Sequence, residues 1–153
     1  MKLFAAFSLV VLLAVTVATA TAATPTQYRV RVNGICRSYT PTGKVLEAQM
    51  TKAENAKDYV AWGVALGKLL VLNLAQDSRI EAVPVPTALK TKLAPILARL
   101  KKIDAHTRTA LADARAGKSQ ALLSELLTIG ELAKPLNKQL DAAGLRDCGS
   151  NQA

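Results

Sequence analysis

The sequence VPVPTALKTKLAPILARLKKIDAHTRTALADAR, residues 83–115, contains a strong turn signal followed by the clearest helical pattern of the chain. Pro84 and Pro86 have no amide donor and push the residues before them away from helical angles, which predicts a turn. After the turn, apolar residues recur every three or four positions, namely Leu89, Leu93, Ile96, Leu97, Leu100, Ile103, Ala110, Leu111 and Ala114. This spacing predicts a long amphipathic helix with one buried face, kinked at Pro95.

Seven basic residues occupy the other faces of this predicted helix, and they are Lys90, Lys92, Arg99, Lys101, Lys102, Arg108 and Arg115. Only Asp104 and Asp113 oppose them. Such a positive face can attract an anionic cell-wall polymer, an acidic lipid surface or an envelope protein. The alternative is that the charges only keep a small protein soluble. Nucleic acid is not an expected partner, because no aromatic residues interleave with the charges for base stacking.

Residues 25–52 combine two patterns. Tyr28, Val30 and Val32 alternate with polar residues as in a half-buried strand, whereas a longer apolar series from Tyr28 to Ala53 fits one helical face. We therefore expect a helix that is bent or briefly broken near Pro41, which cannot donate to the carbonyl one turn back.

Residues 58–79 predict a second helix whose middle is apolar almost all round, which is typical of a buried helix. Gly63 and Gly67 form a G-x-x-x-G pair, a pattern that can mark a dimer face in a membrane span. Because the segment looks too short and too polar for a span, we expect these glycines to allow close helix packing inside a soluble core.

Residues 119–143 predict a fourth helix, capped by Ser119, bent at Pro135 and ended by Gly144 in a left-handed conformation with Leu145 folded back on it. Four amphipathic segments with short connections are typical of an all-α, up-down-up-down four-helix bundle. We expect this bundle to form one domain over residues 23–148, followed by a polar tail at 149–153.

The N-terminus has the pattern of a secretory signal peptide: Lys2, an apolar run over residues 3–17, and small residues up to Ala23. Cleavage after Ala22 would leave 131 residues with a formal charge of +8, since only one lysine and no acid is removed. The alternative is an uncleaved anchor, because the apolar run is nearly long enough to span a bilayer. We expect a secreted or extracytoplasmic, soluble protein.

The chain contains two cysteines, Cys36 and Cys148. In the predicted bundle both lie at the same end, and two cysteines in an oxidising compartment are most simply one disulfide. Their α-carbons must then lie within about 7 Å. The alternative is a redox-active or metal-binding pair, although the usual C-x-x-C motif is absent.

Candidate catalytic residues are few. His106 is the sole histidine, and we expect it to face solvent or a groove, nearer to Lys102 and Arg99 than to Asp104. The acid pairs Glu54–Asp58 and Asp77–Glu81 fall near helix ends and are interpreted as solvated surface. We predict no catalytic residue, no metal and no cofactor, because three or four clustered ligands are lacking.

Several short motifs carry a resemblance: Asn33-Gly34-Ile35-Cys36 with Tyr39, the Pro-x-Pro turn at Pro84, Ala114-Arg115-Ala116-Gly117, and the ending Ala143-Gly144-Leu145-Arg146-Asp147-Cys148. Together they resemble small exported helical-bundle proteins of unknown function from high-G+C Gram-positive bacteria. The resemblance implies the bundle, the disulfide and the compartment, and it brings no catalytic residues.

These observations favour an exported, non-enzymatic binding or interaction module of the cell envelope. A second hypothesis is an extracytoplasmic carrier that holds a small apolar ligand between its helices, because the glycines at 63, 67 and 130 and the prolines at 95 and 135 can loosen the packing. A third is an unfamiliar enzyme that uses His106.

Overall fold

The computed structural model describes residues 23–149, and this part of the chain is helical without a strand. The main helices are α1 (Pro25–Asn55), α2 (Tyr59–Glu81), α3 (Lys90–Arg115), α4 (Ser119–Ala133) and α5 (Leu136–Ala143). Two short 3-10 helices are η1 (Thr87–Leu89) and η2 (Arg146–Cys148). The expected signal peptide at 1–22 and most of the expected polar tail lie outside the described residues.

The first segment is a helix, as the longer apolar series predicted. Thr24 caps it: its hydroxyl accepts from the amide of Gln27, and the Gln27 side chain accepts from the amide of Thr24. Pro25 then occupies the first turn, where its missing donor is not needed. The helix continues without a break past Pro41, so the break considered from the sequence does not occur.

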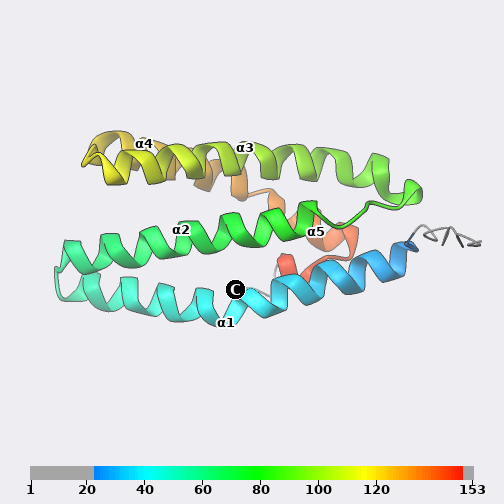
Figure 1. The fold of residues 1–153 in the computed structure, drawn as a ribbon, viewed down its shortest axis with the longest axis horizontal. Coiled ribbons are helices and arrows are strands. Elements are labelled where there is room, and N and C mark those ends of the chain that lie inside the picture. Colours follow the sequence, from blue (N-terminus) through cyan, green and yellow to red (C-terminus); the bar gives the residue numbers. More distant parts are fainter. Residues whose placement is uncertain (1–22, 150–153) are drawn as a thin grey trace, which may run out of the picture.

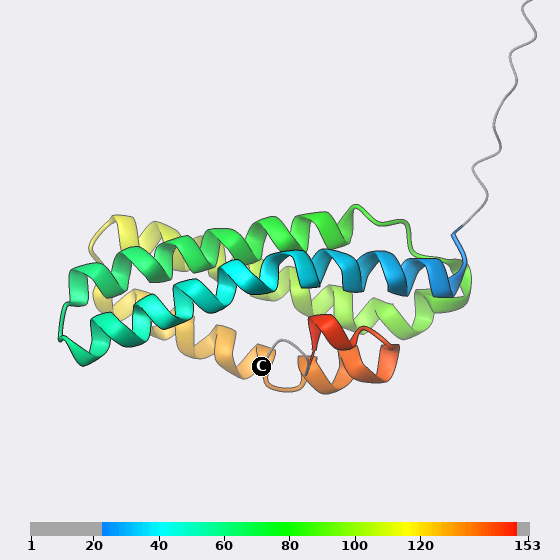
Figure 2. The same cartoon turned by 90° about the horizontal axis from the view of Figure 1, so that it is seen from below.

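The helices lie side by side in two pairs, α1 with α2 and α3 with α4 (Figure 1). The contacts between α2 and α3 join the pairs but are less extensive than those within each pair. α5 and η2 close one end of the molecule, where η2 packs on α1 and α5 on α3 (Figure 2). Within residues 23–149, additional chain thus covers one end of the molecule and leaves the other end uncovered.

The hydrophobic core is also larger at the covered end than at the other end. A large cluster of buried residues surrounds the covered end and includes Tyr28, Val32, Leu93, Leu140 and both cysteines. Towards the other end the fully buried residues of the second cluster are only Leu66, Leu70 and Ala110, supported by partly buried neighbours. No residue of α4 is fully buried. Apolar side chains at this end are therefore incompletely covered.

Three local predictions are wrong. Ser119 does not cap α4, because the cap position is taken by Lys118, whose side chain makes no capping bond. Pro135 interrupts the fourth helix rather than bending it, so that α4 ends at Ala133 and α5 begins at Leu136. The expected buried helix at 58–79 has only four buried residues, Ala65, Leu66, Leu70 and Ile80.

The C-terminal cap was predicted correctly. Gly144 has φ +81°, and its amide donates to the carbonyl of Asp141. A side chain is strained at such an angle, and a Cβ here would also lie 2.9 Å from the Arg29 side chain. Leu145 folds back and is buried.

Candidate functional site

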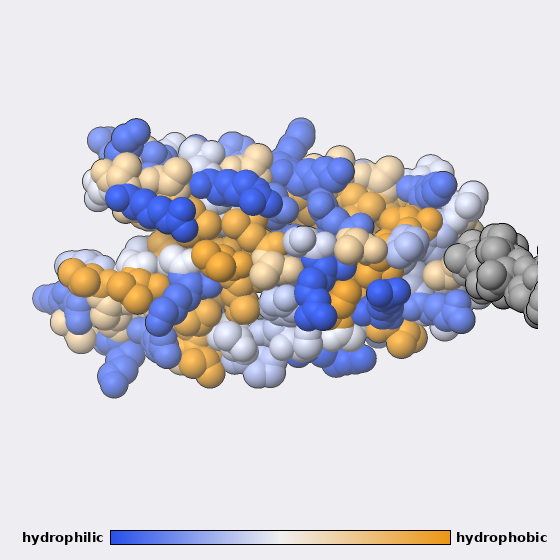
Figure 3. Space-filling view, viewed as in Figure 1, coloured by the Kyte–Doolittle hydropathy of each residue, from blue (hydrophilic) through white to orange (hydrophobic). Residues whose placement is uncertain are grey.

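An apolar groove of about 880 Å³ lies between the N-terminal half of α2 and the junction of α3 with α4. Trp62, Leu66, Leu70 and Leu122 form part of its wall. Figure 3 shows the molecule hollowed at the end where the two helical pairs separate, with apolar side chains below and inside the hollow and polar ones along the upper edge. This is the largest concavity described in the structure, and we take it as the candidate site.

The groove exists because no other described element covers the side of α2 that faces the α3–α4 junction. Tyr59, Val60, Val64 and Val71 line the groove and are 75%, 80%, 54% and 50% exposed. A contiguous exposed apolar patch of this kind is typical of a binding surface. In the described residues α2 alone is long and apolar enough to cross a membrane, by length and composition only. The expectation that it is too short and too polar for this test is wrong.

Gly63 and Gly67 line the groove rather than a tight helix contact. A Cβ built on either residue meets no atom within 4 Å. The expected close packing of two helices on the G-x-x-x-G pair is therefore wrong. The missing side chains instead leave space along the wall that α2 contributes.

The charged residues that line the groove are all cations: Lys68 from α2, Arg115 from α3, and Lys118 from the α3–α4 junction. No described carboxylate lines it. Lys118 has one acidic neighbour, Asp113, at a long 3.9 Å, and its side chain is 67% exposed. In the described part of the chain, neither Lys68 nor Arg115 forms an ion pair. The groove therefore has a positive edge.

The seven basic residues predicted to form one anion-binding face are divided by the structure. Lys90, Lys101, Arg108 and Arg115 are exposed and, at 100° per residue, fall within about 40° of one another along α3. We call these four the basic stripe. Lys92 and Arg99 lie on the opposite side, where they donate to the carbonyls of Ala142 and Leu132. Lys102 is exposed between the two sets.

Two polar pairs were missed from the sequence. Asp77 on α2 and Asp104 on α3 share a side-chain hydrogen bond, and burial together with Asp104 raises the pKa of Asp77 to about 8, with Glu81 adding to the rise. Nδ1 of His106 lies 2.6 Å from Oε2 of Glu125 on α4, so His106 does not simply face solvent. Each pair joins residues far apart in the sequence, and no motif signals it.

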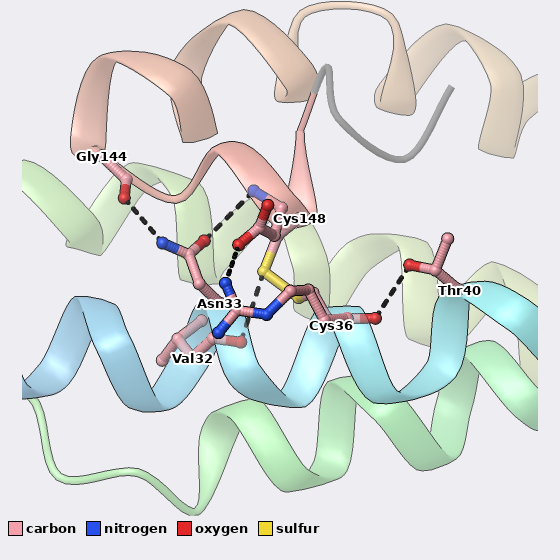
Figure 4. Close-up of polar contacts among 8 residues, drawn as sticks. Val32, Asn33, Cys36, Thr40, Gly144 and Cys148 are labelled. Atoms are coloured by element: carbon pink, nitrogen blue, oxygen red, sulfur yellow. Dashed lines mark hydrogen bonds and ion pairs between the residues drawn. A yellow bond between two sulfur atoms is a disulfide. The ribbon is translucent and has the colours of Figure 1, made fainter.

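The cysteines form the predicted disulfide, with α-carbons 5.2 Å apart. Around it, Arg29, Asn33 and Arg37, each four residues apart on α1, bind the segment 143–147. Asn33 donates to the Gly144 carbonyl at 3.1 Å (Figure 4). Arg29 donates to the Ala143 carbonyl at 2.9 Å. The oxygen of Asn33 accepts from the Asp147 amide, and Arg37 pairs with the Asp147 carboxylate at 2.6 Å. This region holds the C-terminal segment in place.

A disulfide of this kind is typical of an oxidising, extracytoplasmic compartment. No group of three or more potential metal ligands occurs among residues 23–149. No protein-family model matches the chain, and no curated protein or solved structure is significantly similar to it. The resemblance to small exported helical-bundle proteins from high-G+C Gram-positive bacteria therefore stays a prediction.

Proposed function

We propose that this protein is an exported, non-enzymatic binding protein of the cell envelope that carries a small apolar ligand in the groove between its helical pairs. The proposal includes an up-down-up-down bundle and a signal peptide removed after Ala22. The observation that supports it best is the groove itself, a hollow of about 880 Å³ whose wall is apolar. Its volume lies in the range of small-molecule sites.

The distribution of the core supports the same function. Leaving valines and leucines in water is unfavourable by about 25 cal/mol for each Å² of apolar surface, so a ligand that covers them gains affinity from their burial. The disulfide and the α1 contacts fix the covered end, and the groove lies at the end where few residues are fully buried. The disulfide-bonded end therefore supports the groove, while its walls, α2 and the α3–α4 junction, are held by few fully buried residues.

A groove-filling substitution tests the proposal. Gly67→Leu places a side chain in the hollow without removing a core contact, because nothing lies within 4 Å of its Cβ. Gly130→Leu is the matched control, since Gly130 is also an unhindered helical glycine and does not line the groove. Native mass spectrometry of protein purified from its own host should show an additional bound mass in the wild type and in Gly130→Leu, but not in Gly67→Leu.

The same experiment can contradict the proposal. A wild-type protein without any bound mass, and without binding to single-chain lipids added in solution, would contradict a carrier function. A bound mass that Gly67→Leu keeps unchanged would place the ligand outside the groove.

A second function is favoured by the basic stripe, whose four aligned cations suit an anionic polymer, an acidic lipid surface or an acidic face of an envelope protein. In Lys101→Glu/Arg108→Glu, binding to isolated anionic envelope polymers should fall at least tenfold. The control Lys44→Glu/Lys52→Glu changes the net charge equally on α1, where both lysines are exposed. Equal losses in the two variants would mean that only net charge matters.

A further inference from the structure

Resting on the proposed function, we infer that the ligand of the groove is a single-chain anionic amphiphile, whose hydrocarbon chain lies along α2 and whose head group binds Arg115 and Lys118. The ligand class is a long-chain carboxylate or a comparable monoanion. The inference joins two separate features of the groove, its apolar wall and the sign of the charges that line it.

The apolar feature is elongated along a helix. Val60, Val64 and Val71 follow one another on the exposed side of α2 over more than two turns, and the Gly63 and Gly67 positions between them leave the surface open. A hydrocarbon chain can lie along such a wall, because it needs no hydrogen bonds and fits a long, narrow contact. A compact polar metabolite would leave these valines uncovered.

The charged side chains that line the groove are all positive. Arg115 and Lys118 lie three residues apart at the α3–α4 junction, Lys68 lines the groove from α2, and the described lining residues include no carboxylate. Among residues 23–149, Arg115 is exposed and has no carboxylate partner, and the Lys118–Asp113 separation of 3.9 Å leaves Lys118 available to an anion. A carboxylate or phosphate head group satisfies this charge, whereas a neutral or cationic head group does not.

The same charges argue against a second copy of this chain as the occupant. Two copies that covered each other's groove would bring two sets of these cations together, and like charges at an interface oppose association. A bilayer surface is a poorer match than a single molecule, because the apolar residues line a hollow and the cations stand at its edge (Figure 3). A molecule with one chain can enter the hollow, whereas a bilayer contacts what protrudes.

The test compares three probes of equal chain length: dodecanoate and dodecyltrimethylammonium, each below its critical micelle concentration, and dodecanol, below its solubility limit in water. Protein from an exporting host, with its disulfide formed, is titrated while the fluorescence of Trp62 is followed, because Trp62 is the sole tryptophan and lines the groove. We expect dodecanoate to bind at least tenfold more tightly than dodecanol, and the cationic probe to bind most weakly.

The variant Arg115→Gln/Lys118→Gln should reduce the preference for dodecanoate over dodecanol to less than threefold, because loss of the two cations weakens dodecanoate binding far more than dodecanol binding. The matched control is Lys101→Gln/Arg108→Gln, which removes two cations from the same stripe of α3 that do not line the groove. It should keep the wild-type preference. Circular dichroism shows whether each variant keeps its helices.

The outcomes separate the two proposals. Equal wild-type affinities for dodecanoate and dodecanol would overturn the anionic head group but leave the apolar carrier standing, and dependence of both on Gly67→Leu would confirm the groove. No binding of any probe would overturn both. Binding to vesicles of phosphatidylglycerol without binding of monomeric dodecanoate would overturn the inference in favour of a bilayer. A dimer in sedimentation equilibrium, with Trp62 shielded from solvent, would overturn it in favour of a second copy.

Discussion

Asp77 on α2 and Asp104 on α3 share a hydrogen bond across the interface that joins the two helical pairs. Two carboxyl groups can make this bond only while at least one of them holds a proton. Glu81 adds negative charge on the same side of α2, and Tyr28 of α1 lines the adjoining cavity of about 230 Å³. The pair therefore makes the contact between α2 and α3 depend on pH.

We predict that the protein loses stability as the pH rises from about 4 to about 8. Burial and Asp104 raise the pKa of Asp77 from 3.8 to about 8 in the folded state, so the folded protein holds a proton that the unfolded chain releases in this range. The free energy of unfolding therefore falls with pH. Asp77→Asn should stabilise the protein by at least about 1 kcal/mol at pH 8 and have a much smaller effect at pH 4.

Urea unfolding at several pH values measures this difference. Asn73→Ala is the control, because Asn73 lines the same cavity and does not titrate. Its effect on the free energy of unfolding should be the same at pH 4 and pH 8. An Asp77→Asn effect that is constant over this range would contradict a shared proton.

A second prediction concerns the glycines of the groove. Gly63→Ala and Gly67→Ala should each stabilise the protein by about 0.5–1 kcal/mol, because alanine favours the helix and its Cβ meets no atom within 4 Å. Chemical unfolding at pH 4–5 measures the change. Destabilisation by either variant would instead indicate the close helix packing expected from the G-x-x-x-G pattern.

A third prediction concerns the disulfide, which joins residues separated by 112 positions. Cys36→Ala/Cys148→Ala should lower the free energy of unfolding by roughly 3–5 kcal/mol, mainly because the unfolded chain gains freedom. Amide exchange should increase most in α5 and η2, the elements next to Cys148. Faster exchange in α4 without a change in α5 would contradict the proposed division into a fixed end and an adjustable end.

The fourth prediction compares two contacts beside the disulfide. Asn33→Ala should destabilise by about 1–3 kcal/mol, because it removes the partner of the Gly144 carbonyl and of the Asp147 amide in a half-buried site. Arg37→Ala should cost less than about 1 kcal/mol, because the arginine of this ion pair is 63% exposed. Thermal unfolding of both variants in the disulfide-bonded state provides the measurement. Equal effects would contradict the central position given to Asn33.

The sequence predicted those features that depend on local chemistry. The longer apolar series correctly indicated a helix in the first segment, and this helix continues through Thr40 and Pro41. Gly144 was predicted as a left-handed cap because no other residue tolerates that angle so well. Cys36 and Cys148 were paired correctly, since two cysteines allow one intramolecular bridge and the helix order brings them to one end.

The features that depend on packing between helices were not predictable. Whether an apolar helix is covered depends on the neighbouring elements, so Val60 and Val64 looked like core residues although they line a groove. Asp77 and Asp104 lie 27 positions apart, and nothing in their local sequence indicates that they meet. Arg99 and Lys101 look equivalent in the sequence, but one donates to a carbonyl of α4 and the other faces solvent.

The position of the disulfide has a consequence for how the protein responds to cleavage by a protease. The turns at residues 56–58 and 116–118, which are exposed and contain Lys57 and Lys118, both lie inside the ring that the bridge closes. A protease that cuts either turn once opens the backbone but releases no fragment, because Cys36 and Cys148 still hold the two pieces together. Both walls of the groove come from inside this ring, so a singly cleaved molecule keeps them covalently joined.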